Sequence, residues 1–97
     1  MSEASINDAT VVSISEGVLS REAGGDTVLL SLEQERYFSL EGAANRMWEL
    51  VSESKTTTIG SVLAAMQEEF DVDPEVLQAD AFRVFRLLAE QGLVRLG

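Results

Sequence analysis

The sequence predicts a single α+β domain in which a three-stranded antiparallel sheet is followed by three helices. Its 97 residues leave room for one domain. Hydrophobic residues make up 45% of the chain and charged residues 25%, the balance of a folded globular protein. Short strand-like runs fill the chain up to residue 40, and apolar residues then recur at helical spacing. We expect a flexible N-terminus at residues 1–9 and one domain over residues 10–97.

The strand-like runs lie in the front half. Residues 11–14 and 18–22 have strand composition with polar interruptions, and we interpret them as one broken strand. The sequence AGGD at residues 23–26 suits a hairpin connection, because glycine tolerates positive φ. Residues 27–32 form the second strand and residues 36–40 the third, with a polar turn between them. Short strands with tight links predict an antiparallel meander.

Two helices follow the predicted sheet. The first runs to about Glu53, and the second begins after an N-cap at Thr56 or Thr57. We expect the apolar stripes of both helices, including Trp48, Met47 and Met66, to face the core. The stripes consist of Ala44, Met47, Trp48 and Val51 in the first helix, and of Ile59, Val62, Leu63, Met66 and Phe70 in the second.

The last helix has the clearest ends. Asp73 is placed as its N-cap, Pro74 occupies its first position and Gly92 follows its end. We therefore predict a helix over residues 74–91 and a short extended tail over residues 93–96.

The last helix is apolar around an unusually wide arc. The arc spans about 220°, whereas a surface helix needs a stripe of about 100°. The part of the arc beyond such a stripe includes Val76 and Leu87, which lie beside the charged residues Asp80 and Arg83. Either the helix is central and packed on both sides, or part of the arc lines a groove for a partner, whose rim is typically a mixture of apolar and charged residues. The spacing leaves both interpretations open.

The chain is strongly acidic, with 17 acidic and 7 basic residues and a formal charge of −10. This charge argues against a surface that binds nucleic acid or anionic membranes. Residues 1–79 hold fifteen acids and four bases, whereas residues 80–97 hold two acids and three arginines. An anionic or mixed-charge partner is therefore attracted to the second half of the last helix. Chance clustering of three arginines accounts for the difference equally well.

The composition also excludes several chemistries. The chain contains no histidine and no cysteine, which rules out Cys-His zinc sites, thiol nucleophiles and Ser-His-Asp triads. Lys55, the only lysine, lies in a polar linker. We expect no catalytic residue, no metal and no cofactor. The absence of a signal peptide and of a long apolar segment makes the cytoplasm the expected location.

Three strands and three helices also suit a winged helix-turn-helix, a fold that often binds DNA. In this chain, residues 68–75 (EEFDVDPE) would enter the DNA groove, and five of the eight are acidic. We therefore expect a winged helix that does not bind nucleic acid.

The third predicted strand offers a different kind of binding surface. A three-stranded sheet has two edges whose unpaired N–H and C=O groups can accept an added strand. Alternation along residues 36–40 directs Tyr37 and Ser39 to one face and Phe38 and Leu40 to the other. Peptide recognition by strand addition suits this arrangement. The alternative is that Phe38 and Leu40 belong to the core and Tyr37 covers it.

An ordered set of short motifs resembles the PqqD-like family of leader-peptide recognition elements. The form RYFSL…MWEL is most similar to the stand-alone members that serve lasso-peptide biosynthesis. The motifs lie at residues 28–32 (VLLSL), 36–40 (RYFSL), 42–50 (GAANRMWEL), 70–75 (FDVDPE), 79–82 (ADAF) and 91–94 (QGLV).

The resemblance implies a winged-helix fold that binds the leader segment of a ribosomally synthesised precursor peptide. The leader would add as an antiparallel strand beside the third strand, in the cleft against the last helix. The chain would then deliver the precursor to a transglutaminase-like leader peptidase and a macrocyclase. The residues implied in peptide binding are Arg36, Tyr37, Phe38, Ser39 and Leu40 on the strand and Val76, Asp80, Arg83, Val84 and Leu87 on the helix.

Two other functions remain alternatives. One is a non-catalytic protein-interaction domain that contacts its partner without strand addition. The other is a peptide chaperone of quinone-cofactor (PQQ) biosynthesis, as in another branch of the same family.

Overall fold

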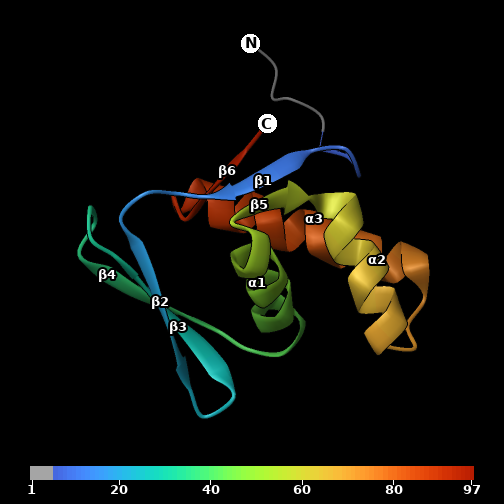
Figure 1. The fold of residues 1–97 in the computed structure, drawn as a ribbon, viewed down its shortest axis with the longest axis horizontal. Helices are drawn as coiled ribbons and strands as arrows, with labels where there is room; N and C mark the ends of the chain where they lie inside the picture. Colours follow the sequence, from blue (N-terminus) through green and yellow to red (C-terminus); the bar gives the residue numbers. More distant parts are fainter. Residues whose placement is uncertain (1–5) are drawn as a thin grey trace.

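The computed structural model describes residues 6–97, which form two small antiparallel sheets and three helices (Figure 1). The expected α+β class is confirmed, with the helices after the three-stranded meander. The elements of the described chain are β1 (Val11–Ile14), β2 (Val18–Ala23), β3 (Asp26–Ser31), β4 (Arg36–Leu40), α1 (Gly42–Ser54), β5 (Thr56–Thr58), α2 (Ile59–Glu69), α3 (Pro74–Glu90) and β6 (Val94–Leu96).

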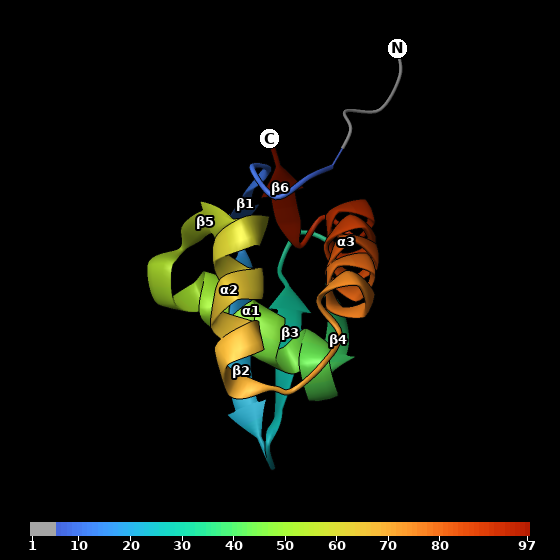
Figure 2. The same ribbon diagram turned by 90° about the vertical axis from the view of Figure 1, so that its right-hand side faces the viewer.

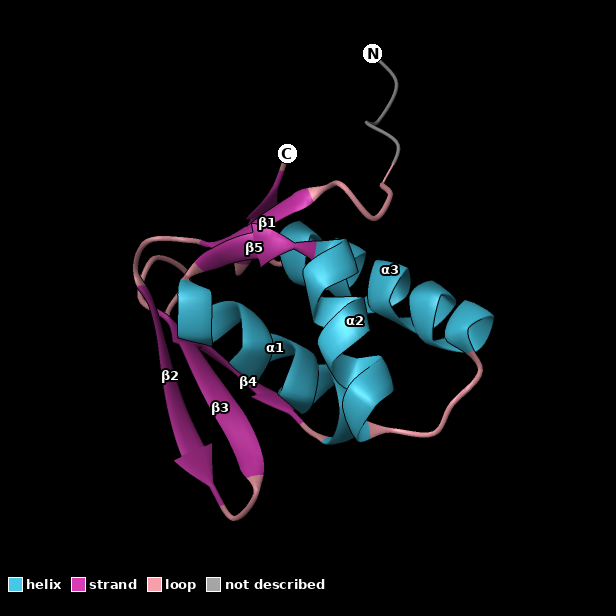
Figure 3. Cartoon of the chain, turned by 45° about the vertical axis from the view of Figure 1, so that its right-hand side comes forward, coloured by secondary structure: helices cyan, strands magenta, loops and turns pink. Residues whose placement is uncertain are grey.

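The interpretation of residues 11–22 as one broken strand is wrong, because its two parts belong to different sheets (Figure 3). β1 is the central strand of a sheet with the order β5-β1-β6, whereas β2 begins a sheet with the order β2-β3-β4. The chain turns between the two strands at Gly17, whose φ is 78°. β6 is the extended tail that the sequence predicts, and it lies beside β1 at one end of the molecule (Figure 2).

The sheet β2-β3-β4, here called the wing sheet, is the predicted meander. Gly24 and Gly25 connect β2 to β3 with φ values of 63° and 91°, conformations that glycine adopts without steric cost. Thr27, Leu29 and Ser31 are buried on the inner face of β3, where α1 packs. The wing sheet therefore has one covered face and one outer face.

The second helix begins later than expected. Its N-cap is Thr58, whose hydroxyl oxygen accepts a hydrogen bond from the Ser61 N–H at 3.1 Å, and not Thr56 or Thr57. The reason is that Thr56–Thr58 pairs with β1 as β5, which delays the start of the helix. Phe70 was expected in the apolar stripe of this helix, but it lies at the C-cap and is exposed.

The third helix agrees closely with the prediction. The Asp73 carboxylate accepts a hydrogen bond from the Glu75 N–H at 2.8 Å, and Pro74 is the first helical residue. The helix ends at Glu90, and Gly92 reverses the chain with a φ of 75°.

One hydrophobic core joins the two sheets and the three helices. Trp48, Met47 and Met66 are buried in it, as expected, and Phe85 is its largest fully buried side chain. The core consists of Val12, Leu29, Met47, Trp48, Val51, Ile59, Val62, Leu63, Met66, Leu77, Ala81, Phe85, Leu88, Leu93 and Val94.

The start of the described chain contacts the helical layer. The Gly60 N–H donates to the Asp8 carbonyl at 2.8 Å, and the Gln78 amide donates to the Asp8 carboxylate at 3.0 Å. Ile6 packs against the core. The expected flexible N-terminus falls partly on residues 1–5, which lie outside the described residues.

An ion pair between α1 and α2 makes the stability of the fold depend on pH. Arg46 donates from Nε and Nη2 to the two carboxylate oxygens of Glu69 at 2.7 and 2.6 Å. These hydrogen bonds hold the pKa of the Glu69 carboxyl below its usual range. The stabilisation is therefore complete above the pKa of Glu69 in the unfolded chain and is lost as the pH falls through the lower pKa of the folded state.

We expect Arg46→Gln to lower the melting temperature by a few degrees at pH 7, because exposed ion pairs contribute little. The difference from the wild type should shrink as the pH falls through the lowered pKa of Glu69, where its carboxylate becomes protonated. Thermal unfolding followed by circular dichroism, at pH 7 and at an acidic pH where Glu69 is protonated, measures it. Arg86→Gln, on an exposed arginine without an ion pair to the rest of the described chain, is the matched control. An equal difference between Arg46→Gln and the wild type at both pH values would contradict the role of the pair.

Candidate functional site

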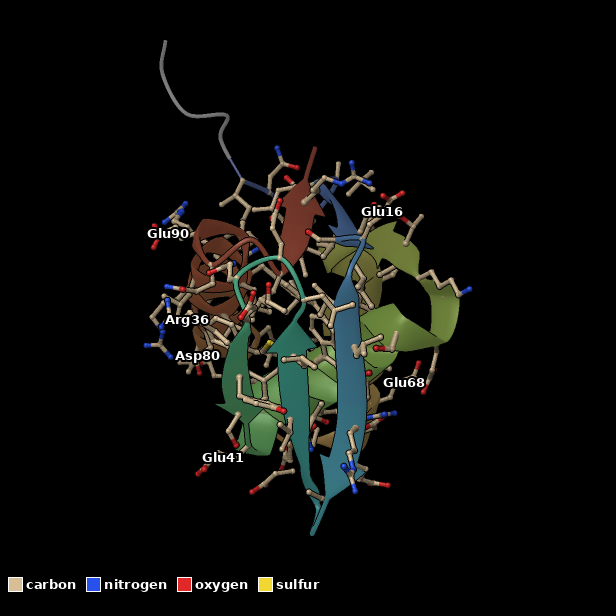
Figure 4. The ribbon with its side chains drawn as sticks, turned by 90° about the vertical axis from the view of Figure 1, so that its left-hand side faces the viewer. Glu16, Arg36, Glu41, Glu68, Asp80 and Glu90 are labelled. Carbon is tan, nitrogen blue, oxygen red and sulfur yellow. The ribbon has the colours of Figure 1, made fainter. Side chains whose placement is uncertain are left out.

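The strand β4 has one open edge. It pairs with β3 on one side, and no strand of residues 6–97 pairs with its other side. Figure 4 shows that β4 is the strand of the wing sheet nearest to α3, with Arg36 and Asp80 on the same side of the molecule. An open edge presents unpaired N–H and C=O groups that can hydrogen-bond to a further strand. The structure thus places the predicted strand and the predicted helix next to each other.

The space between β4 and α3 is closed at one end. The turn before β4 contacts the end of α3, where the side-chain amide of Gln34 donates to the Gln91 carbonyl. A Cβ on Gly92 would lie 3.1 Å from the same amide nitrogen, so the turn fits closely against the helix end. This contact fixes the distance between strand and helix at their closed end.

At the other end the space widens into an apolar hollow of about 320 Å³. The hollow joins the start of α1, which follows β4, to the end of α2 and the first turns of α3. Three of its apolar side chains, Phe70, Val72 and Val76, are exposed. The complete lining is Gly42, Ala43, Met66, Phe70, Val72, Val76, Leu77 and Asp80.

A stripe of α3 runs on from Val76 and Asp80, which line the hollow, at a spacing of four, three and four residues. It consists of Val76, Asp80, Arg83 and Leu87, and we call it the groove stripe. Val76 is 58% exposed and Leu87 is 55% exposed, although both are large apolar side chains. Arg83 donates a hydrogen bond to the Asp80 carboxylate at 3.1 Å. The groove stripe therefore combines two exposed apolar residues with an ion pair between them.

The wide apolar arc of α3 is only partly used by the core. Leu77, Ala81, Phe85 and Leu88 are buried, and the predicted site residue Val84 is half-buried and packs against them. Central packing of the helix does not cover Val76 or Leu87. The apolar arc of α3 is therefore wider than the part that the core covers.

The side chains of β4 alternate between two faces. Phe38 and Leu40 point inward and pack against the core, and the Arg36 guanidinium lies 5.2 Å from the centre of the Phe38 ring. Tyr37 is 73% exposed and points to the outer face, as does Ser39 by alternation. Tyr37 and Ser39 can therefore take part in the groove only through their backbone groups.

The charged side chains at the groove are Arg36, Asp80 and Arg83, and the last two form an ion pair. Within residues 6–97, no group of three or more acidic residues is placed to hold a metal ion. No helix in the same span has the length and apolar content needed to cross a membrane.

Sequence reasoning missed the residues at the two ends of the groove. Phe70 was assigned to the core, and neither Val72 nor Gln34 was assigned to the site. Two exposed apolar residues in a short acidic loop, as at 70–72, are a signal that could have found the hollow. The Gln34 contact depends on a neighbour 57 residues away and leaves no local signal.

Comparison with known proteins gives a consistent result. No curated protein matches the chain. A solved structure, described as "TbiB1 in Complex with the TbiA(beta) Leader Peptide", matches with 29% sequence identity and a TM-score of 0.80, over 86% of this chain and 94% of that one. A family model, "Coenzyme PQQ synthesis protein D (PqqD)", matches residues 26–94, which include the wing-sheet strands β3 and β4 and the whole of α3. The chain therefore belongs to the PqqD family, as its sequence motifs indicated.

Proposed function

We propose that the chain binds the leader segment of a ribosomally synthesised precursor peptide as an added strand on β4, in the groove against α3. The observation that carries this proposal is the open edge of β4, which lies beside the groove stripe of α3 and its exposed apolar and charged side chains. TbiB1, which shares the fold and 29% of its residues, was solved with a leader peptide.

Binding by strand addition divides the recognition between backbone and side chains. The backbone of residues 36–40 supplies hydrogen bonds to any extended peptide. Alternate side chains of the leader point towards Phe38, Leu40 and the groove stripe, and an apolar one fits the hollow beside Val76. Selectivity therefore comes from the spacing of apolar residues in the leader.

The chain then presents the precursor to enzymes that modify it. It has no histidine or cysteine, so the reactions belong to partners. We propose a leader peptidase of the transglutaminase-like type and a macrocyclase, as in lasso-peptide maturation. This delivery takes place in the cytoplasm, where precursor peptides are synthesised.

The proposal is tested by titrating the chain into a fluorescein-labelled leader peptide of its own gene cluster and measuring fluorescence anisotropy. We expect saturable binding with a Kd below tens of micromolar, on the order of that of a small specific interface. A scrambled leader of the same composition is the control. No binding of the true leader at tens of micromolar would rule the proposal out.

The family description favours one further candidate, a peptide chaperone in PQQ synthesis. The same groove would then bind the precursor of that cofactor. Parallel titration with both leaders decides between them, because the stronger binding identifies the pathway. The remaining alternative is a protein-interaction domain that binds its partner without strand addition. Amide hydrogen exchange at residues 36–40, measured with and without the leader, tests this alternative.

A further inference from the structure

The wing sheet is joined to the helices by side-chain hydrogen bonds at its two ends. At the hairpin end, the Asn45 side chain of α1 accepts a hydrogen bond from the Thr27 hydroxyl and donates one to the Gly25 carbonyl at 2.8 Å. At the other end, the Gln34 side-chain amide donates to the Gln91 carbonyl at the end of α3 (Figure 4). Within residues 6–97, no further side-chain hydrogen bond joins this sheet or its turns to a helix.

The apolar contact between these two ends is small. Among the described residues of the wing sheet, only Leu29 has a fully buried apolar side chain. Val18, Phe38 and Leu40 are partly buried and pack against the core. The edge of β4 towards α3 is open, so no backbone pairing holds the strand to the helix. The separation of β4 from α3 therefore depends on the contacts at the two ends of the sheet.

The two end contacts differ in strength. Asn45 is buried, so breaking its two hydrogen bonds would leave buried polar groups unpaired, which is costly. Gln34 is exposed, and its single hydrogen bond to α3 competes with water. The hairpin end is therefore the fixed end of the sheet, and Gln34 holds the end that can move.

The turn that carries Gln34 has a well-defined backbone. Ser31 is buried, and it accepts a hydrogen bond from the Gln34 N–H on its hydroxyl at 3.3 Å and one from the Glu35 N–H on its carbonyl at 2.7 Å. Glu35 has a φ of 55°, a left-handed conformation that costs free energy in a residue other than glycine. Such strain persists where the surrounding contacts require it, and it is common at binding sites. In this turn it accompanies a side chain directed at the end of α3, where carbonyl groups lack partners within the helix.

We propose that Gln34 is a positioning residue for leader binding, whose hydrogen bond to Gln91 holds β4 at the separation from α3 that an added strand requires. This inference rests on the proposed function. Without the hydrogen bond, free chains divide among several positions of the wing sheet, and only some of these accept the leader. The apparent Kd rises as the competent fraction falls. A bound leader contacts β4 and α3 together, so it restores the separation that Gln34 maintains in the free chain.

Two substitutions of Gln34 separate its hydrogen bond from the bulk of its side chain. Gln34→Met keeps the length of the side chain but has no N–H donor, whereas Gln34→Lys keeps a donor. Gln67→Met is the matched control, because Gln67 is an exposed glutamine on α2, outside the wing sheet.

Leader affinity is measured for each variant by fluorescence anisotropy. We expect Gln34→Met to raise the Kd about two- to fivefold, because one exposed hydrogen bond shifts an equilibrium by about tenfold at most. Gln34→Lys and Gln67→Met should bind the leader as tightly as the wild type. All three variants should melt within about four degrees of the wild type, because the substituted side chains are exposed.

A distance across the groove tests the positioning directly. The chain has no cysteine, so Ser39→Cys/Arg86→Cys carries two nitroxide labels, one on the outer face of β4 and one on α3 outside the groove stripe. Double electron–electron resonance measures the distribution of distances between them. In the free chain, adding Gln34→Met should broaden or shift this distribution, and adding Gln34→Lys should not. Saturating leader should return the Gln34→Met chain to the distribution of its parent.

The outcomes distinguish this inference from the proposed function. If the wild type binds the leader but Gln34→Met leaves the free distance distribution or the Kd unchanged, the inference is overturned and the proposed function stands. An equal loss of affinity in Gln34→Lys or Gln67→Met would also overturn it, because the hydrogen bond would not be the cause. Failure of the wild type to bind the leader would contradict the proposed function and, with it, the role of Gln34, whatever the distances show.

Discussion

Leu87→Ala is expected to weaken leader binding by about tenfold or more while changing the free energy of unfolding by less than about 0.5 kcal/mol. The side chain is 55% exposed in the free chain and belongs to the groove stripe, so its truncation removes contact with the proposed peptide and little of the core. Reversing the charge at Asp80 or Arg83 should weaken binding as well, because either reversal leaves the other residue of the ion pair without an opposite charge beside the peptide.

Two matched controls separate the groove from the rest of the surface. Leu19→Ala truncates the same side chain at nearly the same exposed fraction, 54%, outside the groove. Arg86→Glu reverses a charge on an exposed part of the same helix, outside the groove stripe. Both should leave the Kd for the leader within about twofold of the wild type. If Leu87→Ala, Asp80→Lys and Arg83→Glu all bind the leader with unchanged affinity, the groove is wrongly placed.

Phe85→Ala is expected to lower the free energy of unfolding by about 3–5 kcal/mol, the usual cost of removing a buried phenylalanine side chain. Phe85 is fully buried and belongs to the core that joins α3 to the other two helices and the sheets. A domain of this size has a total stability of about 5–15 kcal/mol, so the variant is expected to be partly unfolded at 37 °C. Urea unfolding followed by far-UV circular dichroism measures the loss.

The conservative variant Phe85→Leu serves as the control, because it keeps most of the buried volume and should lose less than half as much stability. A loss below about 1 kcal/mol for Phe85→Ala would mean that the α3 packing described above is wrong. Loss of leader binding in Phe85→Ala but not in Phe85→Leu would show that the groove depends on a folded α3.

The elements that the sequence predicted well are those with local signals. Asp73, Pro74 and Gly92 mark both ends of α3, because caps and helix breakers act through the backbone within one turn. The glycine pair at residues 24 and 25 likewise marks the hairpin of the wing sheet. The motifs of the PqqD family added the prediction of a peptide groove between a strand and a helix that are far apart in the chain.

The second sheet, which the sequence did not predict, depends on partners that are far apart in the chain. Its strands β1, β5 and β6 each have three or four residues, and they pair across 40 residues or more. The broken-strand interpretation failed for this reason, and so did the cap at Thr56 or Thr57. The direction of Tyr37 also could not be known, because alternation defines two faces but not which of them the helices cover.

Strand addition to β4 is the central claim, and amide hydrogen exchange with and without the leader peptide tests it most directly. The account predicts that saturating leader slows exchange at residues 36–40 of β4, whose outward amide groups become hydrogen-bonded, and leaves β2 unchanged. Leader binding that leaves exchange at residues 36–40 unaltered would contradict the account and favour contact without strand addition.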